Sequence, residues 1–184
     1  MSDRAITKEV VAKMMDHAVL KPAMTDEDIR TAAAMCVARG VGDLCVRPTD
    51  TALAASLLKD TGTTVAVVVG FPHGANRTEV KALEARLAIE DGADELDMVM
   101  NIGKFLSGDY EFVRRDIAAV VAEAKPKGVV VKVIFETCLL ALDQVAKACE
   151  IAIEAGADFV KTSTGFNGEG ATPEAVGVML KSCA

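Results

Sequence analysis

Three stretches of the sequence repeat one pattern, in which a helix-like segment ends at a glycine and a strand-like run follows. They are "CVARGVGDLCV", "AIEDGADELDMV" and "AIEAGADFVKTS", with the glycines at positions 40, 92 and 156. Glycine is typical of a helix C-terminus, where the chain takes a left-handed turn. The fifth residue after each glycine is Cys45, Asp97 or Lys161. If the glycines are structurally equivalent, strand alternation places these three side chains on the same side of one sheet.

Short apolar runs alternate with amphipathic segments of helical length along the whole chain. The strand candidates are residues 16–20, 42–46, 64–71, 94–100, 129–136 and 158–163, and the helix candidates are residues 25–40, 50–60, 76–91, 109–125, 142–155 and a segment that begins at Thr172. Near-continuous apolar strands in this order predict a parallel α/β sheet with right-handed helical crossovers. Both a TIM-type (β/α)8 barrel and an open doubly wound sheet fit the order.

The repeated pattern favours the barrel. Lys132 lies in "VVVKVIFE", four positions after Gly128, and adds an ammonium group to the thiol, carboxylate and ammonium of the three repeats. In a barrel, inward-facing residues of different strands meet in layers. In an open sheet the same side chains would be spread over one face.

Composition limits the classes of function. A chain of 184 residues that is 51% hydrophobic predicts one domain over residues 1–184. The net charge of −7 argues against a nucleic-acid partner, and the apolar runs are too short for a membrane partner. No signal peptide is recognisable, and five scattered cysteines indicate reduced thiols, so we expect a cytoplasmic protein. Two histidines and no CxxC pair give no support for a metal site.

A buried lysine beside a second ammonium group suggests covalent chemistry. Burial and like-charge repulsion would lower the pKa of Lys161, so that its free amine could attack a carbonyl and form a Schiff base. Asp97 could then move protons. Each residue has a simpler structural interpretation: Lys161 as a lysine with a solvated head, Asp97 as a buried hydrogen-bonding group, Cys45 as a core residue. Their joint placement favours the catalytic interpretation.

The stretch "TSTGFNGEG" follows Lys161 directly. Its backbone N–H groups could face an anion just before the helix at Thr172, which makes Thr162, Thr164 and Gly165 candidate substrate-binding residues. The stretch matches neither GxGxxG nor a P-loop, and an ordinary glycine-rich turn is the simpler interpretation.

Several motifs, in the correct order, resemble the deoxyribose-phosphate aldolase family. They are "DHAVLKP", "VAVVVGFPHG", "ELDMVMNIG", "VKVIFET" and "VKTSTGF". The resemblance implies a TIM barrel and a class I aldolase that needs neither metal nor cofactor. The implied reaction is the reversible cleavage of 2-deoxy-D-ribose 5-phosphate to D-glyceraldehyde 3-phosphate and acetaldehyde. It also implies that Lys161 forms the Schiff base, Asp97 transfers protons, Lys132 assists at the substrate, and Asp16 and Cys45 line the pocket.

The sequence departs from the family pattern at its C-terminal end. The family continues beyond the helix that begins at Thr172, with a strand that carries a second active-site lysine and then an eighth strand. The present sequence ends at "MLKSCA", so we expect about six of the eight strands and an incomplete C-terminal end. A truncated aldolase, or a short form completed by another chain such as a second copy, would explain this. Alternatives are another Schiff-base barrel lyase and a non-catalytic sugar-phosphate-binding protein.

Overall fold

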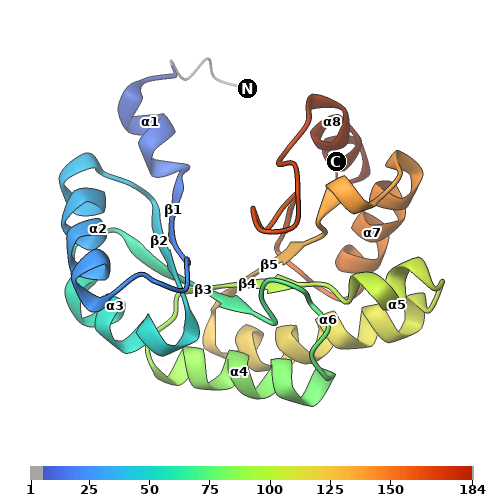
Figure 1. The fold of residues 1–184 in the computed structure, drawn as a ribbon, viewed down its shortest axis with the longest axis horizontal. Coiled ribbons are helices and arrows are strands. Elements are labelled where there is room, and N and C mark those ends of the chain that lie inside the picture. The colour runs from blue at the N-terminus through green and yellow to red at the C-terminus, as the bar shows by residue number, and fades with distance from the viewer. Residues whose placement is uncertain (1–5, 184) are drawn as a thin grey trace.

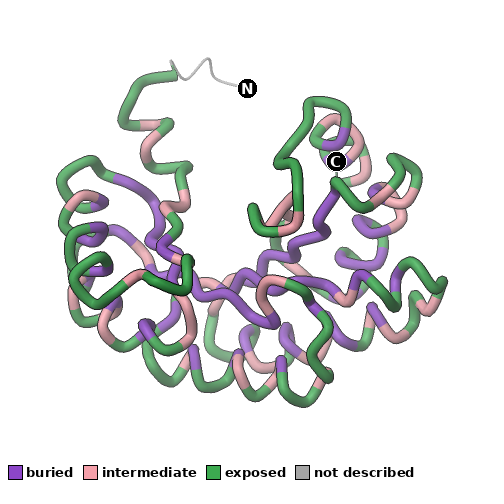
Figure 2. Tube along the Cα trace, viewed as in Figure 1, coloured by how far each residue is buried: buried purple, intermediate pink, exposed green. Residues whose placement is uncertain are grey.

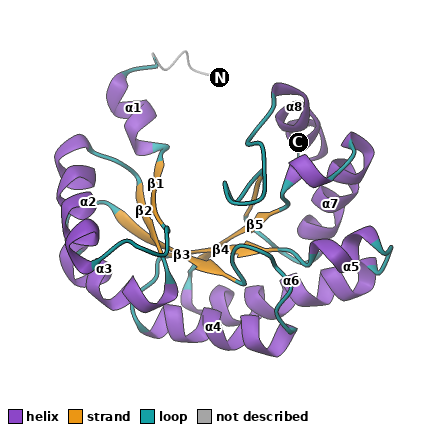
Figure 3. Ribbon diagram, viewed as in Figure 1, coloured by secondary structure: helices purple, strands orange, loops and turns teal. Residues whose placement is uncertain are grey.

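The computed structural model describes residues 6–183 and consists of six parallel strands with helices between them (Figures 1 and 3). The strands are β1 (Asp16–Val19), β2 (Asp43–Val46), β3 (Thr64–Val69), β4 (Glu95–Val99), β5 (Val130–Ile134) and β6 (Phe159–Lys161). The α-helices are α1 (Lys8–Lys13), α2 (Asp26–Arg39), α3 (Thr51–Leu58), α4 (Thr78–Glu90), α5 (Ile102–Leu106), α6 (Tyr110–Ala124), α7 (Leu142–Glu154) and α8 (Pro173–Ser182). Every predicted strand and helix is present, with ends shifted by a few residues.

The sheet is curled, and its strands are arranged in sequence order from β1 to β6. Figure 1 shows an arc of strands with α2 to α7 along its outer side. Helices on one side only are typical of a barrel wall, so the prediction of six strands of a TIM-type barrel is confirmed and the doubly wound alternative is wrong. Within residues 6–183, β1 and β6 each pair with a single neighbour and form the two edges of the sheet.

The two faces of the sheet differ in character because side chains alternate along each strand. Outward-facing residues such as Leu44, Leu96 and Val133 are fully buried and belong to the main core. Figure 2 shows buried residues along the strands. A smaller apolar cluster on the concave face contains Cys45, Ala66 and Val68. The remaining inward positions of the concave face are largely charged, and they form the site described below.

Local sequence signals account for the helix ends. Thr25 and Asp28 form a capping box at the start of α2, and Gly40 ends that helix with φ of 66°. Thr172 caps α8 by accepting a hydrogen bond from the Ala175 N–H at 3.2 Å. The helices α1 and α5 were not predicted, since six or five residues are too few to show a helical period. None of the helices between residues 6 and 183 is long and apolar enough to cross a membrane.

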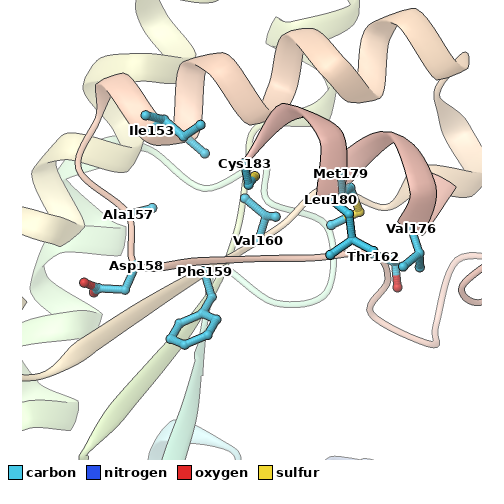
Figure 4. Close-up of a pocket in the computed structure, with 11 residues that line it drawn as sticks. Ile153, Ala157, Asp158, Phe159, Val160, Thr162, Val176, Met179, Leu180 and Cys183 are labelled. Carbon is cyan, nitrogen blue, oxygen red and sulfur yellow. The ribbon is translucent and has the colours of Figure 1, made fainter. Parts of the chain in front are cut away.

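An apolar groove of about 650 Å³ follows the outer side of the edge strand β6 (Figure 4). Its lining includes Ile153 from α7, Val160 from β6, and Met179 and Leu180 from α8. Phe159, at the start of β6, is 60% exposed. The β6 edge is therefore bordered by apolar side chains and has no strand partner other than β5 among the described residues.

A buried ion pair lies outside the concave face. Lys81 of α4 and Asp116 of α6 are both fully buried, with Lys81 Nζ 2.5 Å from Asp116 Oδ2. Lys81 Nζ also donates to the carbonyl oxygen of Val99 at 2.9 Å, and the Thr78 hydroxyl donates to Asp116 Oδ1 at 2.8 Å. This network joins two neighbouring helices to the end of β4, the strand that carries Asp97.

Removing only the cation of this pair should be strongly destabilising. We expect Lys81→Met to lower the free energy of unfolding by about 3–5 kcal/mol, because Asp116 then remains buried and uncompensated. The double variant Lys81→Met/Asp116→Leu should lose much less free energy of unfolding, because it leaves no buried charge without a partner. Urea unfolding measures both, with Arg77→Ala, which breaks an exposed ion pair to Glu79, as the control. A double variant less stable than Lys81→Met would contradict this account.

Candidate active site

The concave face gathers charged side chains from β1, β4 and β6 around Lys161. Lys161 Nζ donates hydrogen bonds to Asp97 Oδ2 and, at 2.9 Å, to Asp16 Oδ2. Asp97 is 1% exposed, whereas the side chain of Lys161 is 29% exposed. The ammonium of Lys161 is thus held between two carboxylates, one of them deeply buried.

Lys132 lies beside Lys161 and is surrounded by carboxylates. Its Nζ is 2.5 Å from Glu95 Oε2 and 2.9 Å from Asp16 Oδ2, the oxygen that also accepts a hydrogen bond from Lys161. Asp97 Oδ1 at 3.5 Å and Asp43 Oδ2 at 3.6 Å complete the group. The two lysines are therefore linked through shared carboxylates on the same sheet face.

Cys45 lies next to Asp97, as the repeated glycine pattern predicted. Its Sγ is 3.8 Å from Asp97 Oδ2, and the residue is buried. Burial and the charge of Asp97 raise the pKa of the Cys45 thiol, so it remains protonated. Cys45 can donate a weak hydrogen bond to Asp97, but it is not a thiolate nucleophile.

The predicted lowering of the Lys161 pKa is wrong. Burial alone would lower the pKa of Lys161, but Asp97 and Asp16 outweigh burial and raise it. The pKa of Lys132 is raised in the same way, with Asp97, Glu95 and Asp16 opposing the effect of burial. Lys161 is therefore an ammonium at neutral pH, and its activation requires a proton acceptor in contact with it.

The pKa values of two carboxyl groups beside the lysines, Asp16 and Asp43, are shifted in opposite directions. Burial would raise the pKa of Asp16, but its hydrogen bonds from Lys132 and Lys161 outweigh burial and lower that pKa to about 2. Burial and the neighbouring Asp16 carboxyl raise the pKa of Asp43 to about 7, although Lys132 lowers it. The Thr64 hydroxyl also donates to Asp43 Oδ1. Asp43 is therefore a carboxyl of this cluster whose charge changes near neutral pH.

A cavity of about 110 Å³ opens beside the Lys161 ammonium. Its lining combines the charged cluster with small and apolar side chains: Asp16, Ala18, Leu20, Cys45, Val68, Phe71, Asp97, Ile134, Lys161, Ser163 and Thr164. The predicted binding residue Thr164 lies in this wall. Gly165 follows it with φ of 78°, a left-handed conformation that favours glycine. We call this cavity the chamber.

Thr162 is not brought to the chamber. Strand alternation turns it to the opposite side of β6, where it lines the apolar groove with Val176 and Met179 (Figure 4). Ser163 takes the inward position instead, two residues after Lys161, and its hydroxyl has no hydrogen-bond partner within residues 6–183. A free hydroxyl in the chamber wall is suited to bind a substrate oxygen.

Four site residues were missed in the sequence: Asp43, Glu95, Glu136 and Ser163. Three of them had a detectable signal, because Asp43, Glu95 and Ser163 each lie two positions from Cys45, Asp97 or Lys161 and so share their side of the sheet. Glu136 is the last residue of the strand predicted at 129–136, but β5 ends at Ile134 and Glu136 has φ of 58°, so strand alternation does not place its side chain, which accepts the Thr164 N–H at 3.1 Å. No group of three or more His, Cys, Asp or Glu residues in the described part of the chain is arranged to hold a metal ion.

The raised pKa of Asp43 predicts a pH-dependent stability. The Asp43 carboxyl has a pKa of about 7 in the folded state and 3.8 in the unfolded state. Its contribution to stability is therefore fully present below about pH 4 and is lost as the pH rises through 7. We expect Asp43→Asn to become more stable relative to the parent chain over this window, by about 2–4 kcal/mol. Urea unfolding at several pH values measures it, with Asp91→Asn, at an exposed site, as the control. A difference that does not change with pH would contradict the assignment.

Comparisons with known proteins identify the family of the chain. Residues 10–183 match the model of the DeoC/LacD family aldolases. Deoxyribose-phosphate aldolase from Clostridium perfringens is 51% identical over 175 residues, which cover 95% of this chain and 78% of that protein. The enzyme of the same name from Thermococcus gammatolerans is 54% identical over 173 residues (93% and 77%). The structure of deoxyribose phosphate aldolase from Aeropyrum pernix, described as a unique tetramer, matches with a TM-score of 0.89 and 34% identity (96% and 74%). The chain therefore belongs to the DeoC/LacD family of aldolases.

Proposed function

We propose that this chain is a deoxyribose-phosphate aldolase that forms a Schiff base on Lys161. The reaction is the reversible cleavage of 2-deoxy-D-ribose 5-phosphate to D-glyceraldehyde 3-phosphate and acetaldehyde. The observation that carries the proposal is the contact between Lys161 Nζ and the buried Asp97 carboxylate beside the chamber. Relatives of that name, about 50% identical over most of the chain, support the choice of substrate.

The first step in this proposal is activation of Lys161. Because the lysine is an ammonium, it must lose a proton before it can attack a carbonyl. Asp97 is the acceptor, since its Oδ2 already receives the hydrogen bond of Lys161. Transfer of that proton within the contact pair gives a neutral amine beside a neutral carboxylic acid, a minor species from which the amine reacts.

In the covalent steps that follow, Asp97 returns this proton and takes up others as the reaction requires. The amine adds to the aldehyde carbon of the open-chain sugar, and Asp97 gives a proton to the carbinolamine oxygen, which leaves as water. The iminium withdraws electrons as the bond between C2 and C3 breaks, and the C3 hydroxyl loses its proton to the Asp97 carboxylate. Glyceraldehyde 3-phosphate leaves. The enamine on Lys161 takes a proton at C2 from Asp97, and water hydrolyses the resulting iminium to acetaldehyde and the Lys161 ammonium, which restores the starting ion pair.

The other charged residues keep this arrangement in place. Asp16 fixes the Lys161 ammonium from β1, and Lys132 supplies a positive charge near the oxygens that change charge during the reaction. Cys45 contacts Asp97 from β2. A cytoplasmic location and association into homo-oligomers are part of the proposal, the latter supported by the tetrameric relative from Aeropyrum pernix.

Chemical trapping tests the Schiff base directly. Acetaldehyde with sodium borohydride should add an ethyl group to Lys161, because reduction of the imine makes the adduct permanent. Peptide mass spectrometry locates the adduct. Lys161→Ala should remove both the adduct and turnover, whereas Lys59→Ala, which changes an exposed lysine, should change neither. An unmodified Lys161 in the parent chain would overturn the proposal.

Removing the proton acceptor should affect chemistry more than binding. We expect Asp97→Asn to reduce kcat by about 10²–10⁴-fold with a much smaller change in KM, since asparagine cannot take the proton of Lys161. Steady-state kinetics of sugar-phosphate cleavage measure both constants, with Asp143→Asn on the exposed start of α7 as the control. A kcat within threefold of the parent value would show that Asp97 is not the acceptor.

A further inference from the structure

We propose that Ser163 is a catalytic residue, whose hydroxyl donates a hydrogen bond to the C3 oxygen of the substrate while the bond between C2 and C3 breaks. The inference deepens the proposed aldolase function and rests on the Schiff base at Lys161. Ser163 undergoes no covalent change. Its role is to bind the oxygen that gives its proton to Asp97.

The Ser163 hydroxyl is buried without a partner. Its Oγ is shielded from water and forms no hydrogen bond within residues 6–183. The only other such side-chain atom in that range is Asp97 Oδ1, and Lys132 Nζ compensates it at 3.5 Å. A buried hydroxyl that makes no hydrogen bond costs stability, because the unfolded chain hydrates it. Such a group calls for an explanation, and a partner that arrives with the substrate supplies one.

The other polar groups of the chamber wall are already engaged. The Thr164 hydroxyl and N–H both donate to the Glu136 carboxylate, and the Cys45 thiol faces Asp97. The remaining polar side chains of the lining are two carboxylates, which accept hydrogen bonds, and the lysine that becomes the imine. Within the described part of the chain, Ser163 is therefore the side chain of the lining whose donor is uncommitted.

Backbone hydrogen bonds hold the chain on both sides of Ser163. The Thr162 carbonyl oxygen accepts the Thr137 N–H at 2.8 Å on one side. The Thr164 N–H donates to Glu136 Oε1 at 3.1 Å on the other side. The Ser163 hydroxyl therefore needs little reorganisation to meet a substrate oxygen, which is the condition under which a hydrogen-bond donor contributes most to catalysis.

The chemistry of the iminium selects the C3 oxygen as the partner. The C1 oxygen has left as water, and C2 of a 2-deoxy sugar carries no oxygen. The hydroxyl on C3 is therefore the first oxygen along the substrate from Lys161. Ser163 lies two residues after Lys161, about 7 Å along an extended chain, and both side chains line the chamber. A substrate that leaves Lys161 in this direction brings its C3 oxygen to Ser163.

Cleavage makes opposite demands on the two sides of the C3 oxygen. Its proton passes to the Asp97 carboxylate, and its bond to C3 becomes the carbonyl of glyceraldehyde 3-phosphate. The electron pair of the bond between C2 and C3 moves toward the iminium and forms the enamine. Negative charge develops on the C3 oxygen as its proton leaves, and a hydrogen bond from Ser163 stabilises that charge without giving up the serine proton. In the reverse direction the same bond polarises the aldehyde that the enamine attacks.

The test variant is Ser163→Ala, which removes the hydroxyl and little else. Borohydride added early in a single turnover of 2-deoxy-D-ribose 5-phosphate should trap a phosphorylated five-carbon adduct on Lys161 before cleavage and an ethyl adduct after it. The ratio of ethyl to five-carbon adduct therefore reports cleavage separately from Schiff-base formation. We expect Ser163→Ala to lower this ratio by about 10–100-fold at an unchanged total of adducts. The rate of trapping with acetaldehyde, which has no C3, should stay within about twofold of the parent value.

Stability gives a second measurement that does not depend on activity. Because the hydroxyl has no partner in the protein, Ser163→Ala should leave the urea midpoint of unfolding unchanged or raise it. Ser56→Ala makes the same chemical change at an exposed position of α3 and is the matched control. It should leave the adduct ratio at the parent value.

The outcomes separate the competing explanations. An unchanged adduct ratio in Ser163→Ala would overturn the proposal. An equal fall of both adducts would leave the ratio constant and indicate a structural role, which would overturn it too. So would a clear fall in the urea midpoint or a failure to fold, since either would show that the hydroxyl has a partner inside the protein. Absence of any adduct on Lys161 in the parent chain would instead refute the proposed Schiff base, and this inference with it.

Discussion

Two ammonium groups share one carboxylate oxygen on the concave face of the sheet. Asp16 Oδ2 accepts hydrogen bonds from both Lys132 and Lys161, and Asp97 lies within reach of both lysines. Each charge is removed from water to some degree, so each depends on its partners for compensation. The arrangement brings together strands that are far apart in the sequence, and it requires the curvature that turns β1 and β6 toward the same interior. The remaining structure supports this cluster: the apolar outer face binds the helices, and the Lys81–Asp116 pair secures the end of β4.

Much of the fold could be predicted because glycine and strand periodicity are local signals. The glycines at 40, 92 and 156 all have positive φ, as the repeated pattern required. Counting from them placed Cys45, Asp97 and Lys161 on one side of the sheet, and the contacts among these side chains confirm it. The short helices α1 and α5 escaped prediction because one or two turns carry no period. The curvature of the sheet was inferred from the need to bring polar groups together, not from any single segment.

The site was predicted less completely, for a physical reason. The sequence showed lysines in apolar runs, and burial alone would have lowered their pKa values. The structure adds carboxylates from other strands, such as Asp16, which lies 145 residues from Lys161 in the chain. Coulombic attraction at hydrogen-bonding distance outweighs the loss of hydration, so the sign of the shift reverses. Glu136 was missed because the predicted strand at 129–136 ends at Ile134 in the structure, and the contacts of Glu136 are with Thr164 and Asn167 of a loop.

The account rests on Lys161 being a carboxylate-bound ammonium that becomes a nucleophile only by proton transfer to Asp97. The most direct test is a titration of the Lys161 side chain by nuclear magnetic resonance, with ¹⁵N-labelled lysine and with Lys161→Met to assign the Nζ signal. The account predicts that this signal keeps the chemical shift of an ammonium from pH 6 to beyond pH 10. A titration midpoint near pH 7 or 8 would contradict it, because the free amine would then exist without help from Asp97.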